Sequence, residues 1–182
     1  CQGSYSVGIG FGALMNCTVD HNVAVGGSAL QNNTSGTYNS AIGYECMNKC
    51  STGSYNTVMG YQALYYNTTG ADNSAFGYHA LYNNTTGYAN TALGIDALYE
   101  NTTGNHNECV GRYALYSNTT GCYNIAMGYK ALYTSTNTDF QIAIGAYALE
   151  YSTSGSNNTA VGYASMGNNT TGADNSAFGF YS

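Results

Sequence analysis

The sequence repeats a unit of seventeen residues from one end to the other, and this period constrains its fold more than any other feature. The unit reads Gly-x-Tyr-Asn-Ser/Thr-Ala-(large apolar)-Gly-Tyr-x-Ala-Leu-Tyr-x-Asn-Thr-Thr, and only the first copy is one residue short. The units begin at Gly3, Val19, Gly36, Gly53, Gly70, Gly87, Gly104, Gly121, Thr138, Gly155 and Gly172. A fixed period of this size is typical of a solenoid, whose coils bury their apolar faces against one another.

The positions of the unit predict one coil each of an all-β, parallel β-solenoid (β-roll) with about eleven coils. The eighth position is Gly in every unit, from Gly10 to Gly179, which suits a corner of the coil. The seventh position is always apolar, and the twelfth, as at Leu98, is Leu or Met. We expect these two positions to form the core. We also expect residues 1–182 to be one repetitive domain and a segment of a longer fibre.

The sixth position is small, and it carries Ala in most units, including Ala75, Ala92 and Ala126. Neighbouring residues of a strand face opposite ways, so a core at the seventh position leaves the sixth on the outside. Such a strip is either merely small and exposed, or a place where another chain packs closely. We expect the second, with Ala75, Ala92 and Ala126 in contact with a neighbouring chain.

The rest of the unit is less regular. The Asn-Thr-Thr-Gly segment, as at 67–70, has the residues of an outer turn, because Asn and Gly tolerate left-handed backbone and Thr caps amides. The Tyr-x-Ala-Leu-Tyr segment could be extended or a single helical turn. It is too short for an independent helix, so we expect it to be extended.

Composition excludes two classes of function. The chain has three strong bases, Lys49, Arg112 and Lys130, against a net charge of −6, so it cannot supply the basic patch that nucleic acid requires. No stretch approaches the ~18 consecutive apolar residues of a membrane span. We therefore expect neither nucleic acid nor a membrane span.

Three segments of the repeat resemble a known family. The segments 73–77, 90–94 and 158–162, each Asn-Ser/Thr-Ala-(apolar)-Gly, look like the repeat of trimeric autotransporter adhesin heads. Similar repeats occur in phage tail-fibre-like and other cell-surface fibre proteins, and the resemblance covers the whole chain. It implies a left-handed parallel β-roll with three chains side by side that binds host matrix or other cells. The unit here is longer than the adhesin-head repeat, by a Leu-Tyr-x-Asn-Thr-Thr segment.

The sequence shows no residue pattern that is typical of a catalytic or metal-binding site. His21 and His106 share the third position but lie five coils apart, roughly 24 Å at strand spacing. The acidic residues stand singly, and Asp72 and Asp174 suit solvated turns better than a calcium loop. We expect no enzyme activity, no cofactor and no metal.

Cysteine and asparagine suggest covalent modification. Cys46 and Cys50 lie four residues apart across a turn and form the best candidate disulfide, while Cys17 and Cys122 are free or link chains. Asn-x-Ser/Thr acceptor patterns recur along the chain, although each is also simply a good turn. The candidate glycosylation sites are Asn33, Asn67, Asn84, Asn101, Asn118 and Asn169.

Tyrosine recurs at the ninth and thirteenth positions, as at Tyr61 and Tyr82. Stacked Tyr rows stabilise neighbouring strands, or they form an aromatic surface for sugars. We expect a structural repeat of an extracellular, cell-surface or virion fibre with adhesive or receptor-binding use. Its partners would be copies of itself, as a trimer or an end-to-end filament, and cell-surface glycans or matrix. The alternatives are a lectin-like adhesin module and an ice-binding solenoid.

Overall fold

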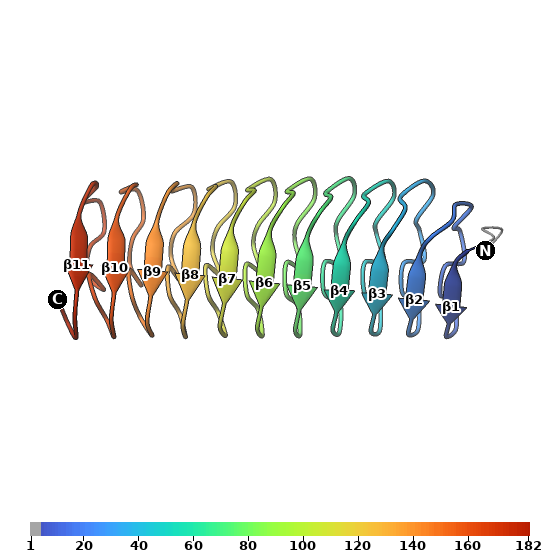
Figure 1. Ribbon diagram of the computed structural model, residues 1–182, viewed down its shortest axis with the longest axis horizontal. Helices are drawn as coiled ribbons and strands as arrows, with labels where there is room; N and C mark the ends of the chain where they lie inside the picture. The colour runs from blue at the N-terminus through green and yellow to red at the C-terminus, as the bar shows by residue number, and fades with distance from the viewer. Residues whose placement is uncertain (1–4) are drawn as a thin grey trace.

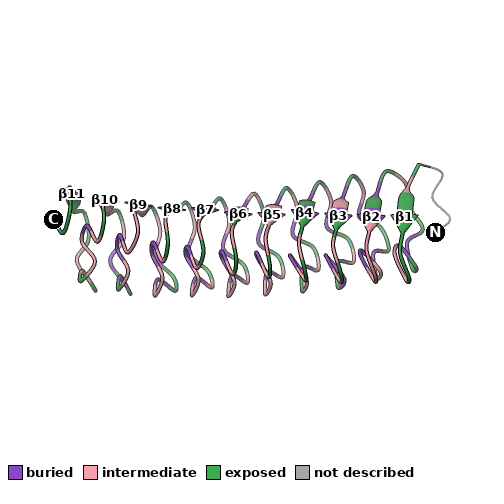
Figure 2. Cartoon of the chain, turned by 90° about the horizontal axis from the view of Figure 1, so that it is seen from below, coloured by how far each residue is buried: buried purple, intermediate pink, exposed green. Residues whose placement is uncertain are grey.

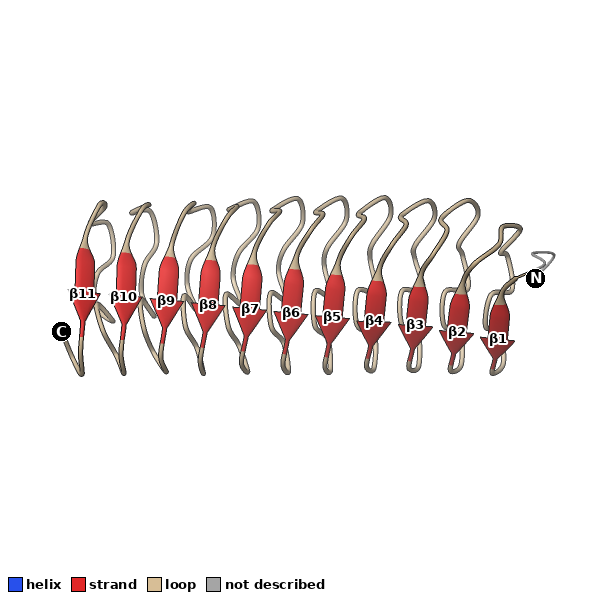
Figure 3. Ribbon diagram, viewed as in Figure 1, coloured by secondary structure: helices blue, strands red, loops and turns tan. Residues whose placement is uncertain are grey.

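The computed structural model describes residues 5–182 and is all-β (Figure 3). Each seventeen-residue unit contributes one strand of three residues, and loops and turns complete the coil. The strands are β1 (Val7–Ile9), β2 (Val23–Val25), β3 (Ser40–Ile42), β4 (Thr57–Met59), β5 (Ser74–Phe76), β6 (Thr91–Leu93), β7 (Glu108–Val110), β8 (Ile125–Met127), β9 (Ile142–Ile144), β10 (Thr159–Val161) and β11 (Ser176–Phe178). No helix in this part of the chain is long and apolar enough to cross a membrane.

All eleven strands form one parallel sheet in chain order, β1 to β11. Each strand pairs with the next at the same position of the unit, so that Ala75 lies beside Ala92 and Phe76 beside Leu93. Figure 1 shows the result, a stack of coils with the strands side by side and the two ends of the chain at opposite ends of the stack. The predicted parallel β-solenoid is confirmed.

The two faces of each strand are reversed relative to our expectation. The sixth position points into the coil, where Ala75 and Ala92 are fully buried, while the seventh points outward, and Leu93 is 48% exposed. The coil consists of one short strand and several turns, and the interior at the sheet holds only small side chains there. Large residues at the seventh position therefore line the outside, and the prediction that they form the core is wrong.

The core consists instead of Ala at the sixth and eleventh positions and Leu at the twelfth. Leu64, Leu81 and Leu98 are fully buried, which confirms the twelfth position as a core position. Figure 2 shows buried segments recurring from coil to coil beside exposed ones. The core residues belong to one hydrophobic cluster, in which the twelfth position is Leu or Met from Leu14 to Met166.

Asparagine fills the remaining interior, at the fourth and fifteenth positions. Asn84 Nδ2 donates to Asn67 Oδ1 at 3.0 Å and to the Gly87 carbonyl at 3.0 Å. Asn73 Nδ2 donates to the same Gly87 carbonyl at 3.0 Å, from the fourth position of the preceding coil. Buried amides of this kind are stable only when they are hydrogen-bonded, and here consecutive coils supply the partners, except at Asn118 Oδ1.

The segment that we expected to be extended forms consecutive turns. Ala80 N donates to Gly77 O at 3.5 Å and Tyr82 N donates to His79 O at 3.2 Å, and the third residue of each turn has positive φ. The intervening amides bond to neighbouring coils, as Leu81 N does to Ala97 O at 3.0 Å. The turns therefore continue the coil-to-coil ladder although they are not strands.

Glycine at the eighth position is required by the corner that follows each strand. Gly94 has φ of +146°, and a Cβ added there would lie 2.6 Å from the carbonyl oxygen of Gly111. Left-handed backbone and close approach of the next coil both exclude a side chain. This confirms the corner predicted from the sequence.

Candidate interaction surface

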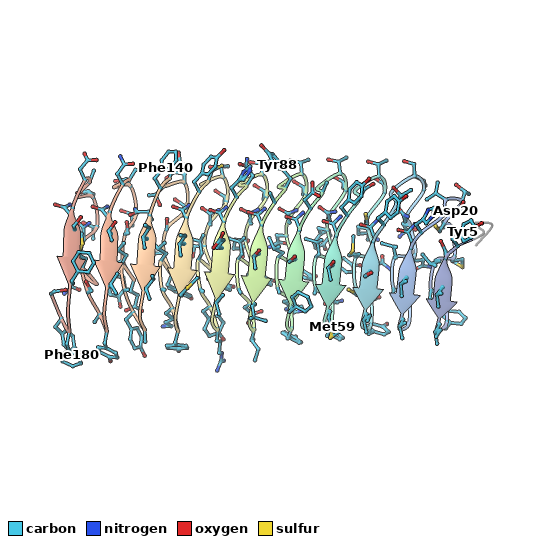
Figure 4. The ribbon with its side chains drawn as sticks, in the orientation of Figure 1. Tyr5, Asp20, Met59, Tyr88, Phe140 and Phe180 are labelled. Carbon is cyan, nitrogen blue, oxygen red and sulfur yellow. The ribbon has the colours of Figure 1, made fainter. Side chains whose placement is uncertain are left out.

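The outward face of the sheet carries a continuous row of large apolar side chains, which we call the apolar strip. It comprises the seventh position of every unit: Ile9, Val25, Ile42, Met59, Phe76, Leu93, Val110, Met127, Ile144, Val161 and Phe178. Met59 is 47% exposed and Leu93 48% exposed, and Val25, Phe76 and Val161 are half-buried. Figure 4 shows Met59 at the end of β4 and Phe180, from the ninth position, at the adjoining edge. Exposed apolar rows of this length mark interaction sites.

Only two charged residues lie on this face. Among the fifth, seventh and ninth positions of all units, Glu108 and Arg112 are the only charged side chains. Both are exposed and both belong to the coil that contains β7. Arg112 Nη2 lies 2.9 Å from the Tyr113 hydroxyl, and its guanidinium lies 4.6 Å from the centre of that ring. The other ten charged residues of the chain lie elsewhere on the coil.

The expected contact of another chain with Ala75, Ala92 and Ala126 is not possible in this fold. All three side chains are fully buried inside their own coil. A core of large seventh-position residues would leave the small sixth-position residues outside, and the fold has the opposite arrangement. The residues available for contact are their neighbours in sequence, such as Phe76, Leu93 and Met127.

The expected disulfide does not form, since Cys46 and Cys50 are both free thiols. They lie at the eleventh and fifteenth positions, where Cys46 Sγ donates to Val58 O at 3.6 Å and Cys50 Sγ donates to Gly53 O at 3.6 Å. Desolvation raises the pKa of Cys46 to about 12 and that of Cys50 to about 11. Both are therefore inert core thiols, and Cys17 and Cys122 are free as well.

The fold makes five of the six candidate glycosylation sites inaccessible to modification. Asn33, Asn67, Asn84, Asn101 and Asn118 are fully buried. Each donates its Nδ2, the atom that would carry a glycan, to the carbonyl of the Gly three residues later. Asn169 is half-buried and donates to Gly172 O at 2.9 Å. Asn of the Asn-Thr-Thr-Gly segment is therefore a core residue, which is an outcome that a turn pattern alone does not reveal.

Tyrosines of the thirteenth position form a stacked ladder. The ring centres of Tyr82, Tyr99 and Tyr116 are 5.2 Å apart, with interplanar angles of 4° and 2°. Desolvation is the main cause that raises the pKa of Tyr82 to about 12, so its hydroxyl is neutral. Rings stacked in this way cover one another's faces and present their edges outward. This favours the structural interpretation of the ladder over a sugar platform.

The tenth position connects four polar side chains across successive coils. Gln62 Nε2 donates to Glu45 Oε2 at 2.6 Å, and His79 Nε2 lies 3.0 Å from Gln62 Oε1. His79 Nδ1 lies 3.5 Å from Asp96 Oδ1. Desolvation lowers the pKa of His79 more than Asp96 raises it, and desolvation also raises the pKa of Asp96. At neutral pH His79 is therefore a neutral hydrogen-bonding group rather than one partner of an ion pair.

A hollow of about 240 Å³ interrupts the aromatic surface near β10. It lies where Gly167 takes the place of Tyr at the thirteenth position, and it is lined by Tyr147, Tyr163, Tyr181 and Glu150, among others. Tyr147 and Tyr181 each meet the Tyr163 ring edge-on, at 74° and 69°. Phe180 stacks on one face of the Tyr163 ring, with ring centres 5.2 Å apart, so only the opposite face of this ring lacks a stacked partner.

Within residues 5–182 no three His, Cys, Asp or Glu side chains converge as a metal site requires. The Thr hydroxyls of the sixteenth position are engaged, as Thr85 Oγ1 donates to Thr102 O at 2.9 Å. Exposed Thr residues occur at several positions of the coil, such as Thr86 of the seventeenth and Thr91 of the fifth. Because they are not gathered at one position, they are a weak basis for the ice-binding alternative, which we do not carry further.

The fold and the strip define the chain as a parallel β-solenoid with one exposed apolar sheet face. Comparisons with protein families, with curated proteins and with solved structures found no match.

Proposed function

We propose that this chain is a structural segment of an extracellular fibre, at a cell surface or in a virion, with adhesive or receptor-binding use. The observation that supports this most is the unbroken ladder from β1 to β11, in which every strand pairs in register with the next. A stack of this kind transmits load along its axis through many parallel hydrogen bonds. The resemblance of the repeat to adhesin-head and tail-fibre-like repeats agrees with this role.

The proposal assigns the partners as well. Copies of the same chain assemble into the fibre, and glycans or matrix at a target surface are what the fibre contacts. An antibody raised against the 182-residue chain should label filaments outside the cell or on virions in electron micrographs of the source. Labelling confined to the cell interior would contradict the proposal.

Glycan binding is a second candidate function, and the hollow at Gly167 is the observation that favours it. A pyranose ring has an apolar face that suits the side of Tyr163 opposite Phe180, and hydroxyls that suit the carboxylate of Glu150, which also lies 3.6 Å from Lys130 Nζ. Glycan-array binding should fall when Tyr163 is changed to Ala and persist when the stacked Tyr99 is changed to Ala. Equal binding by the two variants would contradict a site in this hollow.

A further inference from the structure

We propose that the apolar strip is the contact between copies of this chain, which associate side by side, parallel and in register, about a rotation axis that runs along the stack. This rests on the proposed fibre role and names the surface through which the fibre forms. Three properties of the outward face support it: the periodicity of the strip, the extent of the face and the position of the two charged residues beside the strip.

Periodicity limits what can cover the strip. The strip presents one large side chain per coil, and neighbouring coils are one strand spacing apart, ~4.8 Å. A partner that interlocks with this row along its whole length must repeat at the same spacing. A second copy of the chain meets this requirement without adjustment, because its own strip has the same spacing and the same sequence of large and small residues.

The extent of the face approaches that of a stable interface. Eleven coils span about 50 Å along the stack, and the three strand residues of each coil span about 10 Å across it, before the corner at the eighth position. The product is about 500 Å², and the ninth-position side chains at the adjoining edge add to it, toward the ~800 Å² that each partner of a standard interface buries. The aromatic residues and Met of the seventh and ninth positions are types enriched in such interfaces.

The two charged residues of the face fix the orientation. Glu108 begins β7 and Arg112 follows the corner at Gly111, so the two lie on opposite sides of Val110 in one coil. A rotation axis that runs along the stack reverses the order of positions across the face, so the fifth position of one copy meets the ninth position of the other at the same coil. Glu108 of each copy then lies opposite Arg112 of its partner. An antiparallel pairing places neither charge opposite another charge of the face, since both would meet a different coil.

The test measures molar mass by light scattering over a concentration series, on the full 182-residue chain. The parent should form a closed oligomer, and Leu93→Lys should be monomeric. Thr103→Lys, at an exposed position of another face of the same coil, should assemble like the parent. Circular dichroism melting of both variants shows whether the coil itself is intact.

Charge reversal tests the orientation. Glu108→Arg or Arg112→Glu alone should raise the dissociation constant at least about tenfold, because like charges then face each other. The double variant Glu108→Arg/Arg112→Glu should return to near the parent value. A monomeric parent, or single reversals without effect on association, would overturn the proposal. Extracellular filaments in which the chains join only end to end would also overturn it while leaving the fibre role intact.

Discussion

Ala92 and Leu93, neighbours in β6, lie on opposite sides of the sheet, with Ala92 fully buried and Leu93 48% exposed. Every coil repeats this relationship at its sixth and seventh positions, so one residue step separates the core from the outer surface.

The same substitution should therefore have opposite effects at these two positions. Ala92→Arg places a long charged side chain in a closed interior and should lower the free energy of unfolding by several kcal/mol, about 3 or more. Leu93→Arg should leave the fold of the single chain almost unchanged, since the charge remains in water. Thermal or denaturant unfolding followed by circular dichroism compares the two. Equal destabilisation would contradict the assignment of Ala92 to the interior and Leu93 to the outer surface.

The buried asparagine ladder should be sensitive to single changes. Asn101 Nδ2 donates to Asn84 Oδ1 at 2.8 Å and to Gly104 O at 2.9 Å. Asn101→Ala should cost about 2–3 kcal/mol, because a buried acceptor on Asn84 loses its donor. Asn101→Asp should cost more, since a carboxylate would face that same oxygen. The matched control is Asn105→Ala in the adjoining coil, half-buried and outside the ladder, with an expected cost within about 0.5 kcal/mol.

The ladder has one defect, and its repair should stabilise the protein. Asn118 Oδ1 is buried without a hydrogen-bond partner, because the next coil has Ser135 at the fifteenth position, hydrogen-bonded to Thr138. Asn at this position requires Gly three residues later: a Cβ at Gly121 would lie 2.5 Å from Asn118 Oδ1. Ser135→Asn/Thr138→Gly should raise the free energy of unfolding by about 1–3 kcal/mol.

The single variant Ser135→Asn is the control for this repair, and it should destabilise because Thr138 occupies the space its amide needs. A double-mutant cycle measured by urea unfolding gives the coupling between the two positions. A coupling of zero would contradict the spatial requirement.

His79 should make stability depend on pH. Its pKa is lowered in the folded chain by desolvation, so the unfolded chain binds the proton more readily. The contribution of His79 is constant above the unfolded value of about 6.5 and becomes destabilising as pH falls below it. Asp96, whose pKa is raised, opposes this at lower pH by taking up a proton in the folded state.

Between pH 7 and pH 5.5 the melting temperature of His79→Gln should therefore fall less than that of the parent. The difference between the two falls should be small, because the ring is only partly buried. His106→Gln, at an exposed position, is the control and should follow the parent. A variant at His79 with a steeper loss than the parent would contradict the direction of the shift.

Much of the fold could be predicted from the sequence, because the period of seventeen residues sets the coil and the Gly of the eighth position sets its corner. The facing of the strand could not. Ala92 and Leu93 are both apolar, so their alternation does not indicate which one is inside. The usual preference of cores for large residues led to the wrong prediction that Leu93 is buried. The prediction of exposed turn residues at Asn67 and Asn84 was wrong for a related reason, because Asn in a turn and Asn in a buried ladder have the same local sequence. The clue that was present is charge, since the sixth position never carries one and the outward fifth does at Glu108.

Small-angle X-ray scattering of the parent chain and of Leu93→Lys, at matched concentrations, tests the central claim most directly. Both should give particles about 50 Å long, the span of eleven coils at strand spacing. The cross-section of the parent should be that of two or more coils side by side, and that of the variant should be a single coil. A parent with the cross-section of a single coil, or one whose length increases while its cross-section does not, would contradict side-by-side assembly through the apolar strip.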